Sequence, residues 1–203
     1  DMLERFAFGV EWHDEVIKLV RHVLDTPLEP KGGLKLGGLN NSDQLREMEF
    51  HFPLGDISDH RFNQVLNVWE EYGRQGRELS FGQIKGYLKG FIDLIFCYEG
   101  KWYIADYKSN RLNHYSRSEL KRAIHDHDYD LQYLIYTVAL HRYLQQRLHC
   151  YDFESHFGGV YYLFLRGMTP MTGAEQGVWF DRPSRQVIEA LDDLLIEQRN
   201  EDA

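Results

Sequence analysis

Long apolar runs are absent from this 203-residue sequence, and no stretch has the organisation of a signal peptide. The composition therefore predicts a soluble, cytoplasmic protein with no membrane partner. Cysteine is scarce too, since Cys97 and Cys150 are the two in the chain and their spacing fits no metal-binding pattern. Disulfide scaffolds, zinc clusters and four-thiolate iron–sulfur clusters are therefore not expected.

The sequence also lacks a P-loop pattern, G-x-x-x-x-G-K-[ST], so ATP-driven chemistry is not expected in this chain. Positive charge is in deficit, because 32 acidic residues outnumber 23 lysines and arginines and give a formal net charge of -9. Since nucleic-acid binding relies on basic surfaces, this balance argues against a free-standing DNA-binding protein. Basic residues do gather between positions 85 and 122, although most are expected to be individually solvated: Lys85, Lys89, Lys101, Lys108, Arg111, Arg117, Lys121 and Arg122.

What the chain does contain is a mixture of helical and strand patterns in a length that fits one domain. Apolar residues at helical spacing predict helices over about residues 10–25, 58–73, 117–125, 128–147 and 184–198. In the first of these, Val10, Val16, Ile17, Val20 and Val23 form a helical apolar stripe. Strands are predicted at 45–52, on both sides of Glu99-Gly100 and at 157–165, and a glycine-rich loop at 31–41. Strands followed by crossover helices predict an α/β domain with a central mixed sheet flanked by helices.

The strands around Glu99-Gly100 are the most informative of these elements. If the hairpin is symmetric about this turn, Asp93 lies directly opposite Asp106, and Lys108 shares their face. Opposed carboxylates about 5 Å apart repel each other, so a positive charge is expected between them. A divalent metal ion, the Lys108 ammonium and a shared proton each meet that need. Two carboxylates without imidazole or thiolate partners favour Mg²⁺ or Mn²⁺ over zinc.

Three motifs follow one another along the chain: Gly90-Phe91-Ile92-Asp93, Asp106-Tyr107-Lys108 and Gln132-Tyr133-Leu134-Ile135-Tyr136. Together they resemble the GxxD, DYK and QxxxY motifs of the RecB-type nucleases, the family of C-terminal nuclease domains of RecBCD (exodeoxyribonuclease V) within the PD-(D/E)XK superfamily. The resemblance extends over most of the chain. It implies a restriction-endonuclease-like fold and Mg²⁺-dependent hydrolysis of DNA in double-strand-break repair and recombination.

The same resemblance assigns roles to individual residues. Asp93, Asp106 and the backbone carbonyl of Tyr107 would hold Mg²⁺, with Mn²⁺ as an alternative. Lys108 would position the attacking water or stabilise negative charge on the phosphate. Gln132 and Tyr136, four residues apart on one helix face, would contact the DNA backbone or form the edge of the site.

An acidic residue on the strand before the hairpin also belongs to the family pattern. Glu47 is the expected residue, and Glu49 remains an alternative because the two share one face of the predicted strand. The competing interpretation is that both are solvent-facing glutamates on an edge strand.

One family feature is missing. The family places a metal-binding histidine upstream in a Gly-x-x-x-His context, and no such context occurs here. His13 lacks the flanking residues and is expected to be a surface histidine near a helix start. Since the sequence begins at Asp1 rather than methionine, we expect residues 1–203 to be a single nuclease domain, a fragment without the upstream helix. The metal site of this fragment is then incomplete.

The resemblance also implies partners and leaves alternatives. Single-stranded DNA ends would be the substrate, and the RecC and RecD subunits would be protein partners. A second interpretation is a catalytically incomplete nuclease fold that serves DNA or subunit docking. A third is a DNA-end-processing nuclease of the Cas4 group, which is disfavoured because two cysteines are too few for its iron–sulfur cluster.

Overall fold

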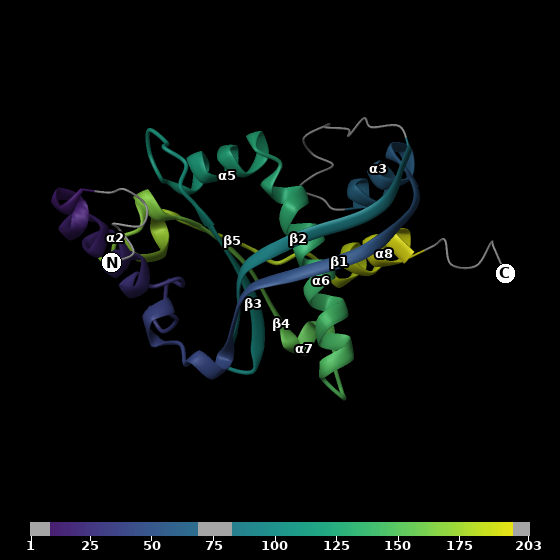
Figure 1. The fold of residues 1–203 in the computed structure, drawn as a ribbon, viewed down its shortest axis with the longest axis horizontal. Helices are drawn as coiled ribbons and strands as arrows, with labels where there is room; N and C mark the ends of the chain where they lie inside the picture. Colours follow the sequence, from purple (N-terminus) through teal and green to yellow (C-terminus); the bar gives the residue numbers. More distant parts are fainter. Residues whose placement is uncertain (1–8, 69–82, 197–203) are drawn as a thin grey trace.

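The computed structural model describes residues 9–68 and 83–196. Its strands form one mixed sheet in the order β1-β2-β3-β4-β5 (Figure 1). β3 and β4 are parallel, and the other neighbouring pairs are antiparallel. The strands are β1 (Gln44–Ser58), β2 (Gln83–Tyr98), β3 (Lys101–Lys108), β4 (Phe157–Phe164) and β5 (Val178–Asp181). This mixed sheet with flanking helices confirms the α/β fold class.

All five predicted helices are found in the described part of the chain, which also contains the short α7 that was not predicted. The helices are α2 (His13–Asp25), α3 (Asp59–Val68), α5 (Arg117–Asp126), α6 (Tyr129–Arg147), α7 (Phe153–His156) and α8 (Arg185–Ile196). Short 3₁₀ turns lie at η1 (Val10–Trp12), η2 (Leu36–Gly38), η3 (Asn41–Asp43), η4 (Leu165–Gly167) and η5 (Gly173–Glu175). The ends predicted for two helices, residues 69–73 and 197–198, lie outside the described residues. Within the described ranges, no helix has the length and hydropathy needed to cross a membrane.

The sheet separates two apolar cores. Helices α5, α6 and α8 cover one face, where the β4 residues Val160, Tyr162 and Phe164 join the larger core. The alternate β4 residues Tyr161 and Leu163 point to the other face and the smaller core. Every residue of β4 is buried, as expected for a strand covered on both sides.

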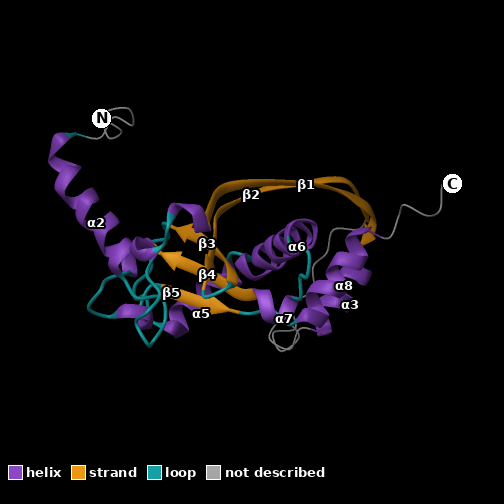
Figure 2. Cartoon of the chain, turned by 90° about the horizontal axis from the view of Figure 1, so that it is seen from below, coloured by secondary structure: helices purple, strands orange, loops and turns teal. Residues whose placement is uncertain are grey.

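Beyond the sheet, β1 and β2 continue as a two-stranded ribbon that arches over α6 (Figure 2). In both strands, the alternation of side chains between the two sheet faces is interrupted at the same paired position. In β1, Leu45 and Met48 both pack against the larger core although they are three residues apart, and Ile92 and Ile95 of β2 do the same. Glu47, between the two β1 residues, has a left-handed backbone with φ of 51°. The pairing register is the same before and after this irregularity.

The first helix differs from its prediction. Within its apolar stripe, Val23 is buried, whereas Ile17 and Val20 are 36% and 49% exposed. Figure 2 shows α2 extending away from the sheet, so its apolar stripe has little to pack against. The loop predicted at 31–41 supplies core residues instead, because Leu34 and Leu36 fill the second face of the sheet. The helix and the loop are both present as predicted, but two stripe residues of the helix are exposed and two leucines of the loop are buried.

Candidate active site

The hairpin has the two-residue turn that its sequence predicts. Glu99 and Gly100 have φ values of 50° and 76°, which is the backbone of a two-residue type I′ turn. The strand pairs are symmetric about this turn and extend back to Leu94 opposite Ala105. The next residues along the two strands are Asp93 and Asp106, so the two carboxylates sit where β2 and β3 separate.

Asp93 is held at that point by the neighbouring strand. Its Oδ2 accepts a hydrogen bond of 2.9 Å from the backbone N–H of Tyr107. A side-chain oxygen thus binds a strand N–H just past the last backbone pair of the hairpin. The carboxylate is fixed against β3 while the backbone of β2 turns away to form the ribbon.

Asp106 and Lys108 form a buried ion pair on β3. Lys108 Nζ lies 2.6 Å from Asp106 Oδ2, and the two side chains are 11% and 5% exposed. Burial raises the pKa of the Asp106 carboxyl, the hydrogen bond and charge of Lys108 oppose that rise, and the Asp93 carboxylate adds to it. The lysine ammonium therefore supplies one of the positive charges expected beside these carboxylates.

Both aspartates act on the same tyrosine hydroxyls. Burial, followed by the charges of Asp106 and Asp93, raises the pKa of Tyr136 to about 12. The pKa of Tyr162 is raised by burial first and also by the same two carboxylates. The electrostatic influence of both carboxylates therefore reaches the two tyrosines.

Gln132 on α6 connects the lysine to both tyrosines. Its Oε1 accepts hydrogen bonds from Lys108 Nζ (2.9 Å) and from the Tyr162 hydroxyl (2.8 Å). Its Nε2 donates to the Tyr136 hydroxyl at 2.9 Å. Gln132 and Tyr136 therefore lie at the edge of the site, with their polar atoms directed at one another and at Lys108.

Two ring systems of this site were not predicted from the sequence. Lys108 Nζ lies 4.0 Å from the ring centroid of Tyr129 and 4.8 Å from that of Tyr162. A signal for Tyr162 was present, because a tyrosine in a fully buried strand needs a partner for its hydroxyl. Tyr129 gave no such signal, since it sits at the first turn of a helix.

The glutamates of β1 are less closely tied to this network. Glu47 is exposed and lies where the alternation of β1 side chains is interrupted. The register of the neighbouring pairs places it opposite Asp93 of β2. Glu49 is paired instead with Lys89 of the ribbon at 2.7 Å, on an exposed surface. Of the two glutamates, Glu47 is the one placed next to the site in the strand register.

The donor chemistry of the site fits a hard cation. Asp93 and Asp106 offer carboxylate oxygens where β2 and β3 separate, and the Tyr107 carbonyl belongs to the backbone between Asp106 and Lys108. In residues 9–68 and 83–196, no three His, Cys, Asp or Glu side chains come together as metal ligands. This ligand set suits Mg²⁺, which usually keeps several waters and takes one or two carboxylates from the protein.

Other candidates lie apart from these residues. His13 begins α2, and its ring nitrogen is 3.9 Å from Asp14. The basic residues between 85 and 122 include several that have local partners: Arg117 stacks on Trp179, and Arg122 pairs with Glu119.

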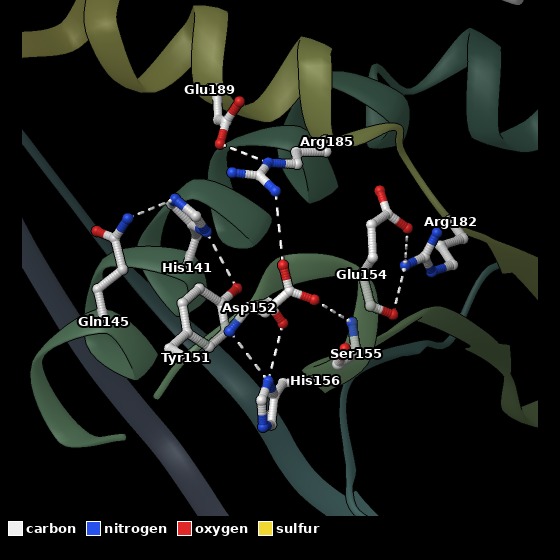
Figure 3. Close-up of polar contacts among 10 residues, drawn as sticks. All are labelled: His141, Gln145, Tyr151, Asp152, Glu154, Ser155, His156, Arg182, Arg185 and Glu189. Atoms are coloured by element: carbon white, nitrogen blue, oxygen red, sulfur yellow. Dashed lines mark hydrogen bonds and ion pairs between the residues drawn. The ribbon is translucent and has the colours of Figure 1, made fainter. Parts of the chain in front are cut away.

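A second polar cluster joins the ends of α6, α7 and α8 (Figure 3). Within it, the buried His141 lies 3.0 Å from the Tyr151 hydroxyl and 2.9 Å from the Gln145 amide. Arg182 and Arg185 pair with acidic residues of α7 and α8. Its charged groups form ion pairs with one another, which is typical of a structural junction between helices.

The profile of the PD-(D/E)XK nuclease superfamily matches residues 11–201. The chain belongs to this superfamily. It is also similar to proteins named RecBCD enzyme subunit RecB: 36% identical to that of Escherichia coli K12 over all of the chain, and 42% identical to that of Haemophilus influenzae over 87% of it. The RecB of Mycolicibacterium smegmatis is 37% identical over 84% of the chain.

The matched stretch is a small part of those relatives. This chain spans 18% of the Escherichia coli protein, 15% of the Haemophilus protein and 19% of the Mycolicibacterium protein. The superfamily profile and the relatives cover the same region of the chain, which confirms the resemblance to RecB-type nucleases inferred from the three motifs.

Proposed function

We propose that this chain hydrolyses phosphodiester bonds of DNA with Mg²⁺, as the nuclease part of a RecBCD-type helicase–nuclease. Two contacts where β2 and β3 separate support the proposal: Asp93 binds the backbone N–H of Tyr107, and Lys108 pairs with Asp106. Membership of a nuclease superfamily gives this arrangement its chemistry. We further infer that residues 1–203 form one nuclease domain that works in the cytoplasm.

The protein residues would divide the work as follows. Asp93 and Asp106, with the Tyr107 carbonyl, would hold the cation, which when bound polarises the phosphate and lowers the pKa of water. Lys108 would orient the attacking water or offset negative charge that develops on the phosphate. Glu47 would add negative charge from the neighbouring strand, and Gln132 and Tyr136 would define the edge along which the DNA passes.

Substrate and partners follow from the RecB relatives. We infer that single-stranded ends reach this site, and that subunits equivalent to RecC and RecD assemble with the longer polypeptide. The formal net charge of -9 supports delivery of DNA by such a complex, since a chain with this charge gains little from phosphate attraction on its own. Mn²⁺ is the expected substitute for Mg²⁺.

A docking module is the second candidate function. It is favoured by the Lys108–Asp106 ion pair, which stabilises the buried carboxylate without a metal ion. It is also favoured by the described residues' lack of a third side-chain ligand. A nuclease assay separates the two candidates.

The assay follows cleavage of an end-labelled single-stranded oligonucleotide by the full chain, with Mg²⁺, with Mn²⁺ and with EDTA. We expect cleavage that needs the metal and falls by about 10²-fold or more in Asp106→Ala and Lys108→Ala. Lys101→Ala is the matched control, since Lys101 is an exposed lysine on the same strand. Circular dichroism checks that each variant is folded.

Two results would contradict the proposal. One is cleavage that persists in EDTA and in both site variants. The other is a folded protein that cleaves nothing with either metal, even when extended upstream to include a histidine in the Gly-x-x-x-His context. That second result would favour the docking module.

A further inference from the structure

The ammonium of Lys108 contacts a carboxylate, an amide and two aromatic rings. Asp106 and Gln132 bind it at 2.6 Å and 2.9 Å. The Tyr129 ring lies 4.0 Å and the Tyr162 ring 4.8 Å from Nζ, both within the range of a cation–π contact. The two ring centroids are 5.5 Å apart, so the rings form two adjoining walls around one charge.

We propose that Tyr129 and Tyr162 are positioning residues that hold the Lys108 ammonium at the site through their rings. This proposal rests on the proposed nuclease function, in which Lys108 acts on the phosphate or the attacking water. A cation bound by Asp106 repels the lysine and competes for its carboxylate partner. The rings and Gln132 attract the ammonium independently of that carboxylate, so they keep it in place.

The surroundings fix the rings themselves. The Tyr129 hydroxyl donates to Asn110 Oδ1 at 3.1 Å, in the segment that follows β3. The Tyr162 hydroxyl donates to Gln132, and its ring packs edge-on against Tyr133. Tyr162 is fully buried in β4, the parallel neighbour of β3. One wall therefore comes from the central sheet and the other from the first turn of α6.

Tyr129 is the residue to change, because Tyr162 is so buried that removing its ring would leave a cavity. Tyr129→Leu removes the ring, and Tyr129→Phe keeps it while losing the hydrogen bond to Asn110. Tyr143→Leu is the matched control, since Tyr143 lies on the same helix and its ring contacts Arg147 at 5.4 Å. All three are made in the full chain.

The first readout is kinetic, with single-stranded DNA and Mg²⁺. We expect Tyr129→Leu to lower kcat by about 3- to 30-fold, the loss of one buried cation–π contact, with little change in KM. Tyr129→Phe should keep the wild-type kcat, because it retains the ring. Tyr143→Leu should leave kcat unchanged.

The second readout does not depend on activity. In protein labelled with ¹³C at lysine Cε, ring currents should shift the Lys108 ε-methylene signal upfield, with the signal assigned by its loss in Lys108→Arg. That shift should persist in Tyr129→Phe and shrink in Tyr129→Leu. If neither the wild-type chain nor its upstream-extended form cleaves DNA, the nuclease proposal fails, and this signal still tests the contact between the Tyr129 ring and Lys108.

Two results would overturn the inference. The first is a Lys108 signal that is the same in Tyr129→Leu and wild type. The second is an equal loss of kcat in Tyr129→Leu and Tyr129→Phe, which would show that the bond to Asn110 matters and the ring does not.

Discussion

Lys108 is the residue on which the contacts of the site converge. It is paired with a buried carboxylate, and both side chains are almost fully removed from solvent. Breaking such a pair by removing one partner leaves an uncompensated charge in a low-dielectric environment. The Lys108–Asp106 pair is therefore expected to contribute to the stability of the fold as well as to the proposed catalysis.

Lys108→Ala should lower the free energy of unfolding by about 3 kcal/mol, measured by urea denaturation. Lys89→Ala is the control, because the Lys89–Glu49 pair is exposed and should contribute less than about 1 kcal/mol. Adding Asp106→Ala to Lys108→Ala should recover part of the loss. Equal losses in the two lysine variants would show that burial of the Asp106 pair has no energetic consequence.

At the scale of elements, the glycine of the first motif has a packing reason. A Cβ at Gly90 would lie 2.5 Å from Cζ of Phe50 on the paired strand. Phe50 is buried, stacks on Phe52 and meets Tyr136 edge-on. The missing side chain thus lets the β1–β2 ribbon bring an aromatic ring onto α6 beside the site.

Gly90→Ala should therefore lower the free energy of unfolding by about 1–3 kcal/mol through overpacking. Gly38→Ala is the matched control, since no atom lies within 4 Å of a Cβ built there and its φ is not positive. The control should change stability by less than about 0.5 kcal/mol. Equal values for the two alanine variants would contradict this explanation of the motif glycine.

The junction of α6, α7 and α8 should make stability depend on pH. Burial lowers the pKa of His141, Arg185 and Arg142 lower it further, and Asp192 and Glu189 oppose them. The unfolded chain, with a histidine pKa of about 6.5, then takes up the proton first. His141 therefore favours the folded state fully above that value and progressively less as pH falls below it.

This effect is measured by urea denaturation between pH 7.5 and 5.5. The free energy of unfolding should fall more steeply in wild type than in His141→Gln, by at most about 1.4 kcal/mol per pH unit. The exposed His149→Gln should keep the wild-type slope. A wild-type slope in His141→Gln would rule out this source of pH dependence.

At the scale of the whole molecule, sequence patterns identified the sheet, the longer helices and the hairpin. The Glu99-Gly100 turn and the strand periodicity were sufficient for the hairpin register as far as Leu94 opposite Ala105, the pair next to Asp93 and Asp106. The patterns predicted the α2 helix but not the exposure of its stripe, because an amphipathic stripe gives no information on whether a partner surface exists. They also missed β5, which is four residues long and follows a turn-rich segment.

The site was predicted in part for a similar reason. Spacing within the motifs brought Asp93, Asp106 and Lys108 together, because strand geometry is local. The rings around Lys108 come from α6 and β4, and their approach depends on tertiary packing that no short pattern encodes. The change of side at Glu47 was also missed, since glutamate rarely adopts a positive φ.

In the proposed mechanism, Asp93 and Asp106 together bind one divalent cation. Titration of Mn²⁺ into the full chain, followed by electron paramagnetic resonance of the free ion, tests it directly. We expect one bound ion per chain in wild type, lost in both Asp93→Asn and Asp106→Asn and displaced by Mg²⁺. Binding that is unchanged in both variants, or absent from the folded wild-type chain, would contradict it.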